Sequence, residues 1–292
     1  GIAVRAIAPF VKSKVNDPAV VVIDENANFS IPLLSGHLGG ANDFAKNLSL
    51  ITGCVPVITT ATDVNKLFSI DSFAKKNNLV MEDMALIKKF SSELLEQKKC
   101  VFFIPQDFFS FTKITGAIPC EIEITANKDY EVLSKPSFSV LPIIQKETER
   151  KNINLIPKIL ILGIGCRKGK TLEEIRNFVL DILSKYSFYK EAVKVVCSID
   201  LKKEEKGIVD FCNELGVEFK TFSNRELMSV NGDFLSSEFV KKITGVENVC
   251  ERSVFACGAK KLLVKKTKGN GMTLAIGIAD IKLNFDSKEI LW

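Results

Sequence analysis

The stretch IPLLSGHLGGANDFAKNLSLITGCVPVITTATD, residues 31–63, decides the fold class of the N-terminal part of this chain. It contains a short apolar segment, a glycine-rich loop at 35–42, a helical segment and a second apolar segment at 55–58. The helix is predicted because apolar side chains recur at a 3.6-residue spacing and Gly53 follows as a terminator. These side chains are Ala41, Phe44, Ala45, Leu48 and Ile51. A strand, a helix and a strand in this order predict a parallel sheet covered by helices.

The same alternation extends over the rest of the chain. Further strands are predicted at 20–23, 101–104, 120–124, 158–162 and 193–197. Further helices are predicted at 71–77, 84–97 and 208–215, after the capping boxes that start at Thr171 and Ser223, and a hairpin is predicted around 268–271. We therefore predict an α/β fold with two or three α/β/α units and mostly parallel sheets.

Changes in composition along the chain predict three regions. Residues 1–64 form an N-terminal α/β domain, 65–152 a middle region that ends in a polar linker at 145–152, and 153–292 a C-terminal α/β domain. The chain opens GIAVRAIAPF, without methionine, and these residues are typical of the interior of a folded unit. We therefore expect the N-terminal unit to be partial and to lack its first strands.

Composition excludes several classes of protein. A chain of 292 residues with 46% hydrophobic and 26% charged residues is a globular protein, and its net charge of +5 is too diffuse for a nucleic-acid footprint. The one histidine, His37, rules out a multi-histidine metal site, and the eight cysteines include no CxxC pair. No apolar run approaches the length of a membrane span, and the start of the chain has no charged region followed by a signal-like core. We expect a soluble, cytoplasmic protein with reduced thiols and neither nucleic acid nor membrane as a partner.

The glycine-rich loop SGHLGGAN, residues 35–42, is the first candidate site. Its glycines let a ligand approach the backbone, and the loop opens into a helix whose first amides can hold developing negative charge. His37 titrates in the range that suits proton transfer near neutral pH. We name His37 as a catalytic candidate and five substrate-binding candidates, which are Ser35, Gly36, Gly39, Gly40 and Asn42. The alternative is a helix-capping turn with an incidental histidine.

ThrThrAlaThrAsp at 59–63 leaves a strand where ligands bind in α/β folds. Thr59 and Thr60 are therefore substrate-binding candidates. Asp63 is a second catalytic candidate that would orient His37 or a water molecule. The alternative for Asp63 is an N-cap of a turn at 65–68.

A second glycine-containing segment, GIGCRKGKT at 163–171, precedes a helix. Its spacing matches neither a P-loop nor a dinucleotide-binding loop, because Gly163 and Gly165 stand at the wrong distance from GlyLysThr. Helix amides together with Arg167, Lys168 and Lys170 nevertheless predict an anion site that suits carboxylates. The alternative is a tight strand-to-helix turn with solvated cations.

Six segments together resemble the CbiG family, the cobalt-precorrin-5A hydrolases of anaerobic cobalamin biosynthesis. In the N-terminal part they are GIAVRAIAPFVKSKVNDPAVVVIDE (1–25), IPLLSGHLGGAN (31–42) and TGCVPVITTATDVN (52–65). In the C-terminal part they are GIGCRKGKTLEEI (163–175), CSIDLKKEEKGI (197–208) and KKTKGNGMTLAIG (265–277). The middle region matches only in length and character.

The resemblance implies a reaction in which water opens the δ-lactone between the ring A acetate and C20 of a cobalt-bound macrocycle. The C20 unit then leaves as acetaldehyde, and cobalt-precorrin-5B remains. In this reaction His37 would be the base that activates water, and the amides of Gly39 and Gly40 would hold the oxyanion. Cobalt arrives within the substrate, so the resemblance implies no cofactor and no protein metal site.

The resemblance also implies partners. The cobalt-corrinoid substrate carries several carboxylates, and the candidate cations for them are Arg5, Arg167, Lys168, Lys170, Lys265, Lys266 and Lys268. Lys268, like Gly163, Gly165, Arg167 and Lys168, is a substrate-binding candidate. Neighbouring cobalamin-pathway enzymes are further expected partners. Two alternatives stay open: a non-catalytic corrinoid carrier, and a nucleotide-dependent enzyme that uses the 163–171 loop.

Overall fold

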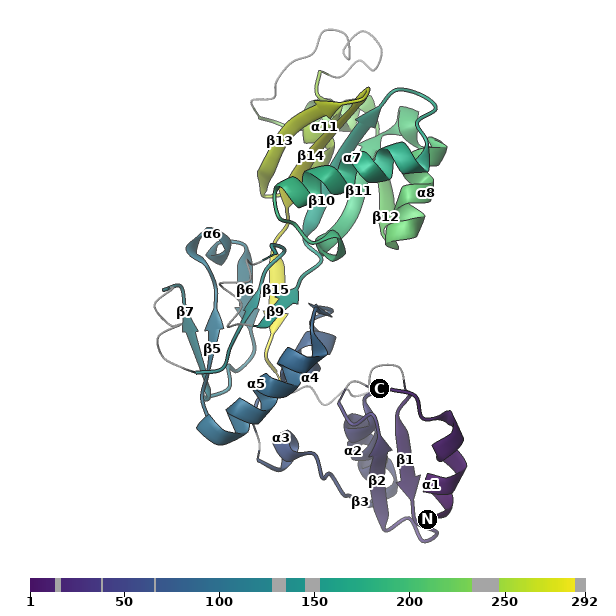
Figure 1. Ribbon diagram of the computed structural model, residues 1–292, viewed down its shortest axis with the longest axis vertical. Helices are drawn as coiled ribbons and strands as arrows, with labels where there is room; N and C mark the ends of the chain where they lie inside the picture. Colours follow the sequence, from purple (N-terminus) through teal and green to yellow (C-terminus); the bar gives the residue numbers. More distant parts are fainter. Residues whose placement is uncertain are drawn as a thin grey trace. The chain divides into compact units, whose positions relative to one another are not determined.

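The structure is a computed structural model that describes residues 1–13, 17–37, 39–65, 67–127, 135–144, 153–232 and 247–286 (Figure 1). It divides into two compact units. Unit 1 comprises Gly1–Phe103, Ile114–Ser139 and Leu283–Trp292, and unit 2 comprises Ile104–Lys113 and Val140–Lys282. The predicted linker at 145–152 lies outside the described residues, and the predicted three-region organisation stays a prediction.

The N-terminal part of unit 1 is a three-stranded sheet in the order β1-β2-β3. The strands are β1 (Val20–Ile23), β2 (Phe29–Leu34) and β3 (Val55–Pro56), and the helices are α1 (Ile2–Ile7), a 3-10 turn (Ala8–Phe10), α2 (Ala41–Thr52) and α3 (Ala61–Val64). β2 pairs antiparallel with β1 and parallel with β3. Helix α2 ends at Gly53 with a φ of 77°, as its sequence predicts. Its small residues Ala41 and Ala45 are buried, whereas Phe44 is 48% and Ile51 81% exposed.

The second part of unit 1 is built around parallel strands. It contains α4 (Ile70–Lys76), β4 (Val80–Met81), α5 (Met84–Gln97), β5 (Cys100–Phe103), β7 (Ile122–Thr125) and β8 (Ser137–Val140). β5 pairs in parallel with both β7 and β8. The core is aromatic: Phe102 and Phe138 stack with ring centroids 4.7 Å apart, and Phe73 meets Phe138 edge-on. The helix predicted at 84–97 is confirmed, and the Asp83 carboxylate caps it by accepting the Ala85 amide at 2.7 Å.

Unit 2 contains a five-stranded mixed sheet in the order β12-β11-β10-β14-β13. The strands are β10 (Leu160–Cys166), β11 (Val193–Ile199), β12 (Glu218–Phe222), β13 (Lys261–Gly269) and β14 (Met272–Ile278). β10, β11 and β12 are parallel, and β14 runs antiparallel to β10 and β13. The predicted α/β class is therefore confirmed, and the antiparallel pairs come from β14 and from the hairpin predicted around 268–271.

Helices cover both faces of this sheet, and α7 crosses in front of it in Figure 1. The helices are α7 (Leu172–Lys185), α8 (Lys206–Leu215), α9 (Asn224–Ser229) and α11 (Val249–Ala256), with 3-10 turns at Lys190–Ala192 and Asp200–Lys202. The capping boxes predicted at Thr171 and Ser223 are both present. The remaining elements are α6 (Gln106–Phe109), β6 (Thr112–Thr115), β9 (Ile153–Ile156) and β15 (Ile281–Asn284), of which β6 and β15 pair. No helix among the described residues is long and apolar enough to span a bilayer.

The segment GlyIleGlyCys at 163–166 is strand and not loop, which corrects the sequence expectation. β10 continues to Cys166 because β14 pairs with it along its whole length, ending at Met272. A Cβ on Gly163 would lie 1.9 Å from the carbonyl oxygen of Cys250 in α11. Gly163 therefore allows α11 to approach the sheet, and the irregular segment before α7 shortens to residues 167–170.

Candidate active site

The glycine-rich loop is folded tightly onto the start of α2. The amide of Ala41 donates to the carbonyl of Ser35 at 3.1 Å, and the amide of Asn42 donates to the carbonyl of Gly36 at 3.0 Å. A Cβ on Gly39 would lie 2.3 Å from the Ser35 Cβ, so no larger residue fits there without movement. The glycines therefore allow the loop to fold back tightly on itself, and His37 lies within this folded loop.

Two conformational features anchor the loop. Ser35 is buried with a φ of 56°, and its hydroxyl donates to the carbonyl of Asp17 at 2.8 Å. Gly40 has a φ of 85°, which favours glycine, and its amide donates to the carbonyl of His37 at 3.1 Å. The Gly40 amide is thus already hydrogen-bonded within the loop, and its expected role in holding an oxyanion stays a prediction.

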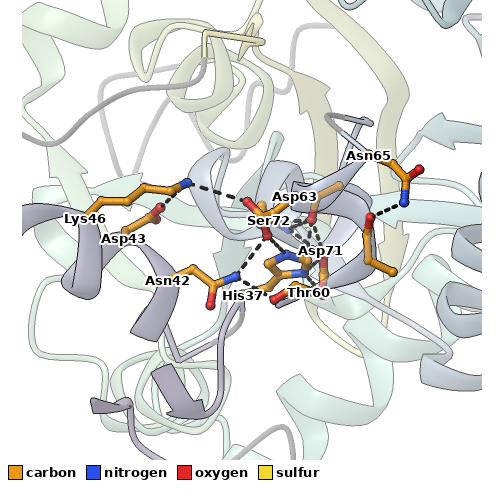
Figure 2. Close-up of polar contacts among 11 residues, drawn as sticks. His37, Asn42, Asp43, Lys46, Thr60, Asp63, Asn65, Asp71 and Ser72 are labelled. Atoms are coloured by element: carbon orange, nitrogen blue, oxygen red, sulfur yellow. Dashed lines mark hydrogen bonds and ion pairs between the residues drawn. The ribbon is translucent and has the colours of Figure 1, made fainter. Parts of the chain in front are cut away.

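His37 lies between two carboxylates, as Figure 2 shows. Its Nε2 is 2.7 Å from Oδ2 of Asp63, and its Nδ1 is 3.3 Å from both carboxylate oxygens of Asp71. The side chains of His37 and Asp71 are 9% and 7% exposed, whereas Asp63 is 26% exposed. The cluster therefore has a buried side at Asp71 and an open side at Asp63.

Two further side chains contact the Asp63 carboxylate (Figure 2). The amide of Asn42 donates to Asp63 Oδ2 and to the Thr60 hydroxyl, both at 2.9 Å. Lys46 Nζ lies 3.5 Å from Asp63 Oδ1. Thr59 is exposed. Asp63 lies within α3, whose N-cap is Thr60, so the alternative of an N-cap role for Asp63 is wrong.

Asp71 is a member of the site that sequence reasoning missed. It stands in the first turn of α4, and the Ser69 hydroxyl, which caps that helix, donates to Asp71 Oδ1 at 2.5 Å. Ser69 Oγ also lies 3.4 Å from His37 Nδ1. Local sequence explains Asp71 as a favourable acidic residue near a helix N-terminus, and no motif links it to His37.

The carboxylates hold His37 in its charged form. Burial by itself lowers the pKa of His37, but hydrogen bonds to Asp63 and Asp71 and their negative charges outweigh it and raise the pKa from 6.5 to about 9. The bond from His37 lowers the pKa of Asp63 despite partial burial, with help from Lys46 and Asn42. At neutral pH His37 is therefore an imidazolium whose two N–H groups both face carboxylates.

The structure narrows the second predicted loop to residues 167–170 in unit 2. Some of its predicted anion-binding groups already bind carboxylates of this chain. The amide of Gly169 donates to the Glu205 carboxylate at 2.6 Å, and Lys170 pairs with Glu174 at 2.6 Å. Gly165 is half-buried next to the Thr273 hydroxyl. These contacts support a strand-to-helix turn and give no phosphate cradle at Gly163 and Gly165.

Two cationic segments nevertheless come together in unit 2. The amide of Arg167 donates to the carbonyl of Gly271 at 3.0 Å, which places the 167–170 loop beside the β13–β14 hairpin. Arg167, Lys168 and Lys268 are exposed there, and the positive charge of Lys168 also acts on the Glu205 carboxylate. We call these three residues the hairpin cation group. β13 is an edge strand, and its lysines also oppose pairing with another chain.

The other predicted cations differ in their surroundings. Lys265 is exposed on β13, whereas Lys266 is half-buried and its amide donates to the buried Glu251 at 2.7 Å. Arg5 is exposed on α1 in unit 1, so it belongs to a different unit from the hairpin cation group. The described residues contain no group of three or more His, Cys, Asp or Glu side chains that could hold a metal ion.

Comparison with known proteins adds sequence evidence. The family model for Cobalamin synthesis G N-terminal matches residues 1–63, and the one for Cobalamin synthesis G C-terminus matches residues 160–277. The cobalt-precorrin-5A hydrolase of Priestia megaterium is 32% identical over 286 residues, which are 95% of this chain and 76% of that protein. The cobalt-precorrin-5A hydrolase of Salmonella typhimurium strain LT2 is 32% identical over 285 residues, which are 96% of this chain and 80% of that protein.

Among solved structures, CobE, a protein from the cobalamin biosynthetic pathway, is 26% identical. The match covers 43% of this chain and 94% of CobE, with a TM-score of 0.40.

Proposed function

Because this chain belongs to the CbiG family of cobalamin synthesis proteins, we propose that it is a cobalt-precorrin-5A hydrolase. The observation that carries this proposal is the 32% identity to two proteins of that name over at least 95% of the chain. The Asp63–His37–Asp71 cluster supports it, since it joins an imidazole from the glycine-rich loop to two carboxylates, an arrangement that suits proton transfer.

The proposed reaction opens a lactone and then breaks a carbon–carbon bond. Water adds to the lactone carbonyl, the ring A acetate leaves as a carboxylic acid, and the oxygen on C20 becomes a hydroxyl. Collapse of that hydroxyl to an aldehyde releases the two-carbon C20 unit as acetaldehyde, while the macrocycle takes the bonding electrons and a proton. One water molecule is consumed, and the macrocycle itself supplies the electron sink, so the protein has to position groups and move protons.

His37 suits the role of acid better than the role of base. At pH 7 a group with a pKa of about 9 is almost wholly protonated, so only about 1% of the imidazole is free to accept a proton. Asp63 lies on the open side of the cluster, and a substrate oxygen that replaces it at Nε2 would receive the proton. We assign this proton to the lactone oxygen that leaves, and Asp71 keeps the imidazole oriented from behind.

The substrate carboxylates provide a role for the hairpin cation group. Cobalt-corrinoid intermediates carry acetate and propionate side chains, and exposed guanidinium and ammonium groups bind carboxylates. Arg167, Lys168 and Lys268 come from two segments that the fold brings to one place. They would bind the rim of the macrocycle, and the cobalt would remain a part of the substrate.

The test is anaerobic incubation of the chain with cobalt-precorrin-5A, with acetaldehyde as the measured product. We expect release of acetaldehyde and a slowing of about 10² or more in His37→Ala. Asp107→Asn, an exposed aspartate on α6, is the matched control and should leave the rate unchanged. Tight binding of the substrate without acetaldehyde would replace the hydrolase by a corrinoid carrier. Full activity of His37→Ala would remove His37 from the mechanism.

A further inference from the structure

Helix α8 begins with two residues that its own stability does not explain. Glu205 is the N-cap, but its side chain makes no hydrogen bond to the amides of the helix, and short polar residues are preferred at that position. Gly207 lies in the first turn and is buried, although glycine has a low helix propensity. A contact outside α8 must therefore account for this helix start.

Both residues contact the loop that precedes α7. The Glu205 carboxylate accepts the amide of Gly169 at 2.6 Å through Oε1 and the ammonium of Lys202 at 2.7 Å through Oε2. A Cβ on Gly207 would lie 2.2 Å from the carbonyl oxygen of Lys170, so a larger residue would push the loop away. The start of α8 is thus fitted to this loop, and local helix preference is given up for the contact.

The Glu205 contact is shielded from water. The side chains of Glu205 and Lys202 are 8% and 12% exposed. Burial raises the pKa of Glu205, but the hydrogen bonds from Lys202 and from the Gly169 amide lower it overall, so the carboxylate is ionised at neutral pH. A buried pair of this kind adds little net stability compared with apolar residues, whereas its short charged hydrogen bonds fix geometry.

The two segments that Glu205 joins follow neighbouring parallel strands. β10 ends at Cys166 and β11 at Ile199, and ligands of α/β folds bind at the carboxyl ends of such strands. The segment after β10 carries Arg167 and Lys168 of the hairpin cation group. A Cβ on Gly271 would lie 3.1 Å from Cδ of Arg167, so this side chain extends along the β13–β14 hairpin. The conformation of the loop therefore decides where these cations lie.

We propose that Glu205 is a positioning residue of the hairpin cation group, because its carboxylate holds the loop in the conformation in which Arg167 and Lys168 bind carboxylates of one macrocyclic ligand. This inference rests on the proposed function, which assigns substrate carboxylates to that group. The negative charge of Glu205 by itself disfavours an anionic ligand. Positioning and charge thus predict opposite effects when the carboxylate is removed.

The test is a fluorescence titration of uroporphyrin, a porphyrin with several carboxylates, with the full chain at low salt. In Glu205→Gln the side-chain nitrogen cannot accept a hydrogen bond, so either the Gly169 amide or the Lys202 ammonium loses its acceptor. We expect the dissociation constant to rise about 3- to 10-fold, the loss expected for one exposed cation. The matched control is Glu204→Gln, an exposed neighbour with the same change of charge, and it should not weaken binding.

A second variant perturbs the loop without changing a charge. Gly207→Ala places a methyl group against the Lys170 carbonyl and should also raise the dissociation constant, although alanine favours the helix. Urea unfolding of each variant, measured in the titration buffer, shows that the chain is folded when it binds. This variant keeps the proposal testable if Glu205→Gln does not fold.

A double-mutant cycle separates positioning from a general structural role. If Glu205 acts through the cations, Arg167→Ala should cost less affinity in the Glu205→Gln chain than in the unmodified chain. Independent effects would instead multiply. With cobalt-precorrin-5A as substrate, Glu205→Gln should raise KM by a similar factor and leave kcat close to its original value, because it changes binding and not the reacting groups.

Several results would overturn the proposal. They are unchanged or tighter uroporphyrin binding in Glu205→Gln, equal weakening in Glu204→Gln, and losses of Glu205→Gln and Arg167→Ala that multiply. Lack of uroporphyrin binding by the unmodified chain would also overturn it. The proposed hydrolase function is tested separately by acetaldehyde release from the unmodified chain, so failure of one proposal is distinguishable from failure of the other.

Discussion

Replacing Asp71 by asparagine should lower the pKa of His37, because it removes the buried one of the two carboxylates that hold the imidazolium. In the intact site the pKa of His37 rises from 6.5 to about 9. Each pKa unit corresponds to about 1.4 kcal/mol of free-energy difference between the charged and the neutral form. Asp63 and Asp71 together therefore favour the charged form by about 3 kcal/mol after the opposing effect of burial. Loss of one opposite charge at hydrogen-bond distance lowers such a pKa by about one to two units.

The measurement is direct because the chain has a single histidine. The imidazole Cε1–H resonance of His37 can be followed by NMR between pH 5 and pH 10 without ambiguity of assignment. We expect a midpoint near 9 in the unmodified chain and a clearly lower one in Asp71→Asn. The matched control Asp107→Asn removes an exposed aspartate and should leave the midpoint in place.

The same shift predicts the pH dependence of stability. The pKa of His37 is higher in the folded state than in the unfolded state, so the folded state binds the proton more tightly. Its stabilisation is fully present below about pH 6.5 and is lost as the pH rises to about 9. In urea titrations, the free energy of unfolding should therefore fall by about 3 kcal/mol between pH 6.5 and pH 9. The same fall should be absent in His37→Gln. An NMR titration midpoint of His37 near pH 6.5 would refute the conclusion that His37 is an imidazolium at neutral pH. An equal loss of unfolding free energy in His37→Gln would refute it as well.

The remaining predictions concern catalysis, packing and binding. If His37 is the acid, kcat/KM for acetaldehyde release falls as the pH rises through about 9, whereas a rise over the same range would identify a base. Gly163→Ala should lower the free energy of unfolding by about 1–3 kcal/mol in urea titration, because its Cβ meets the backbone of α11, and a neutral outcome would contradict that packing. Arg167→Ala should weaken binding of a polycarboxylate porphyrin about 3- to 10-fold at low salt in fluorescence titration. Lys261→Ala, at the other end of β13, is the control for Arg167→Ala, and equal losses in both would leave the hairpin cation group without a specific role.

Part of the fold was predictable because it depends on neighbours in sequence. The helix at 84–97, the capping boxes at Thr171 and Ser223 and the stop of α2 at Gly53 are set by residues within one or two turns. The extent of β10 was not predictable in this way. Two glycines suggested a loop, whereas pairing with β14 continues the strand to Cys166 and the closeness of α11 accounts for the glycine at 163.

For the candidate site, the sequence by itself determined that one imidazole stands in a glycine-rich loop and that Asp63 follows the next strand. Composition and local spacing are sufficient for both statements. Tertiary structure alone brought in Asp71, 34 residues from His37, and buried the ring between two carboxylates. The protonation state of His37 depends on burial and on charges from distant segments, so the raised pKa that leads us to propose an acid in place of the expected base follows only from the fold.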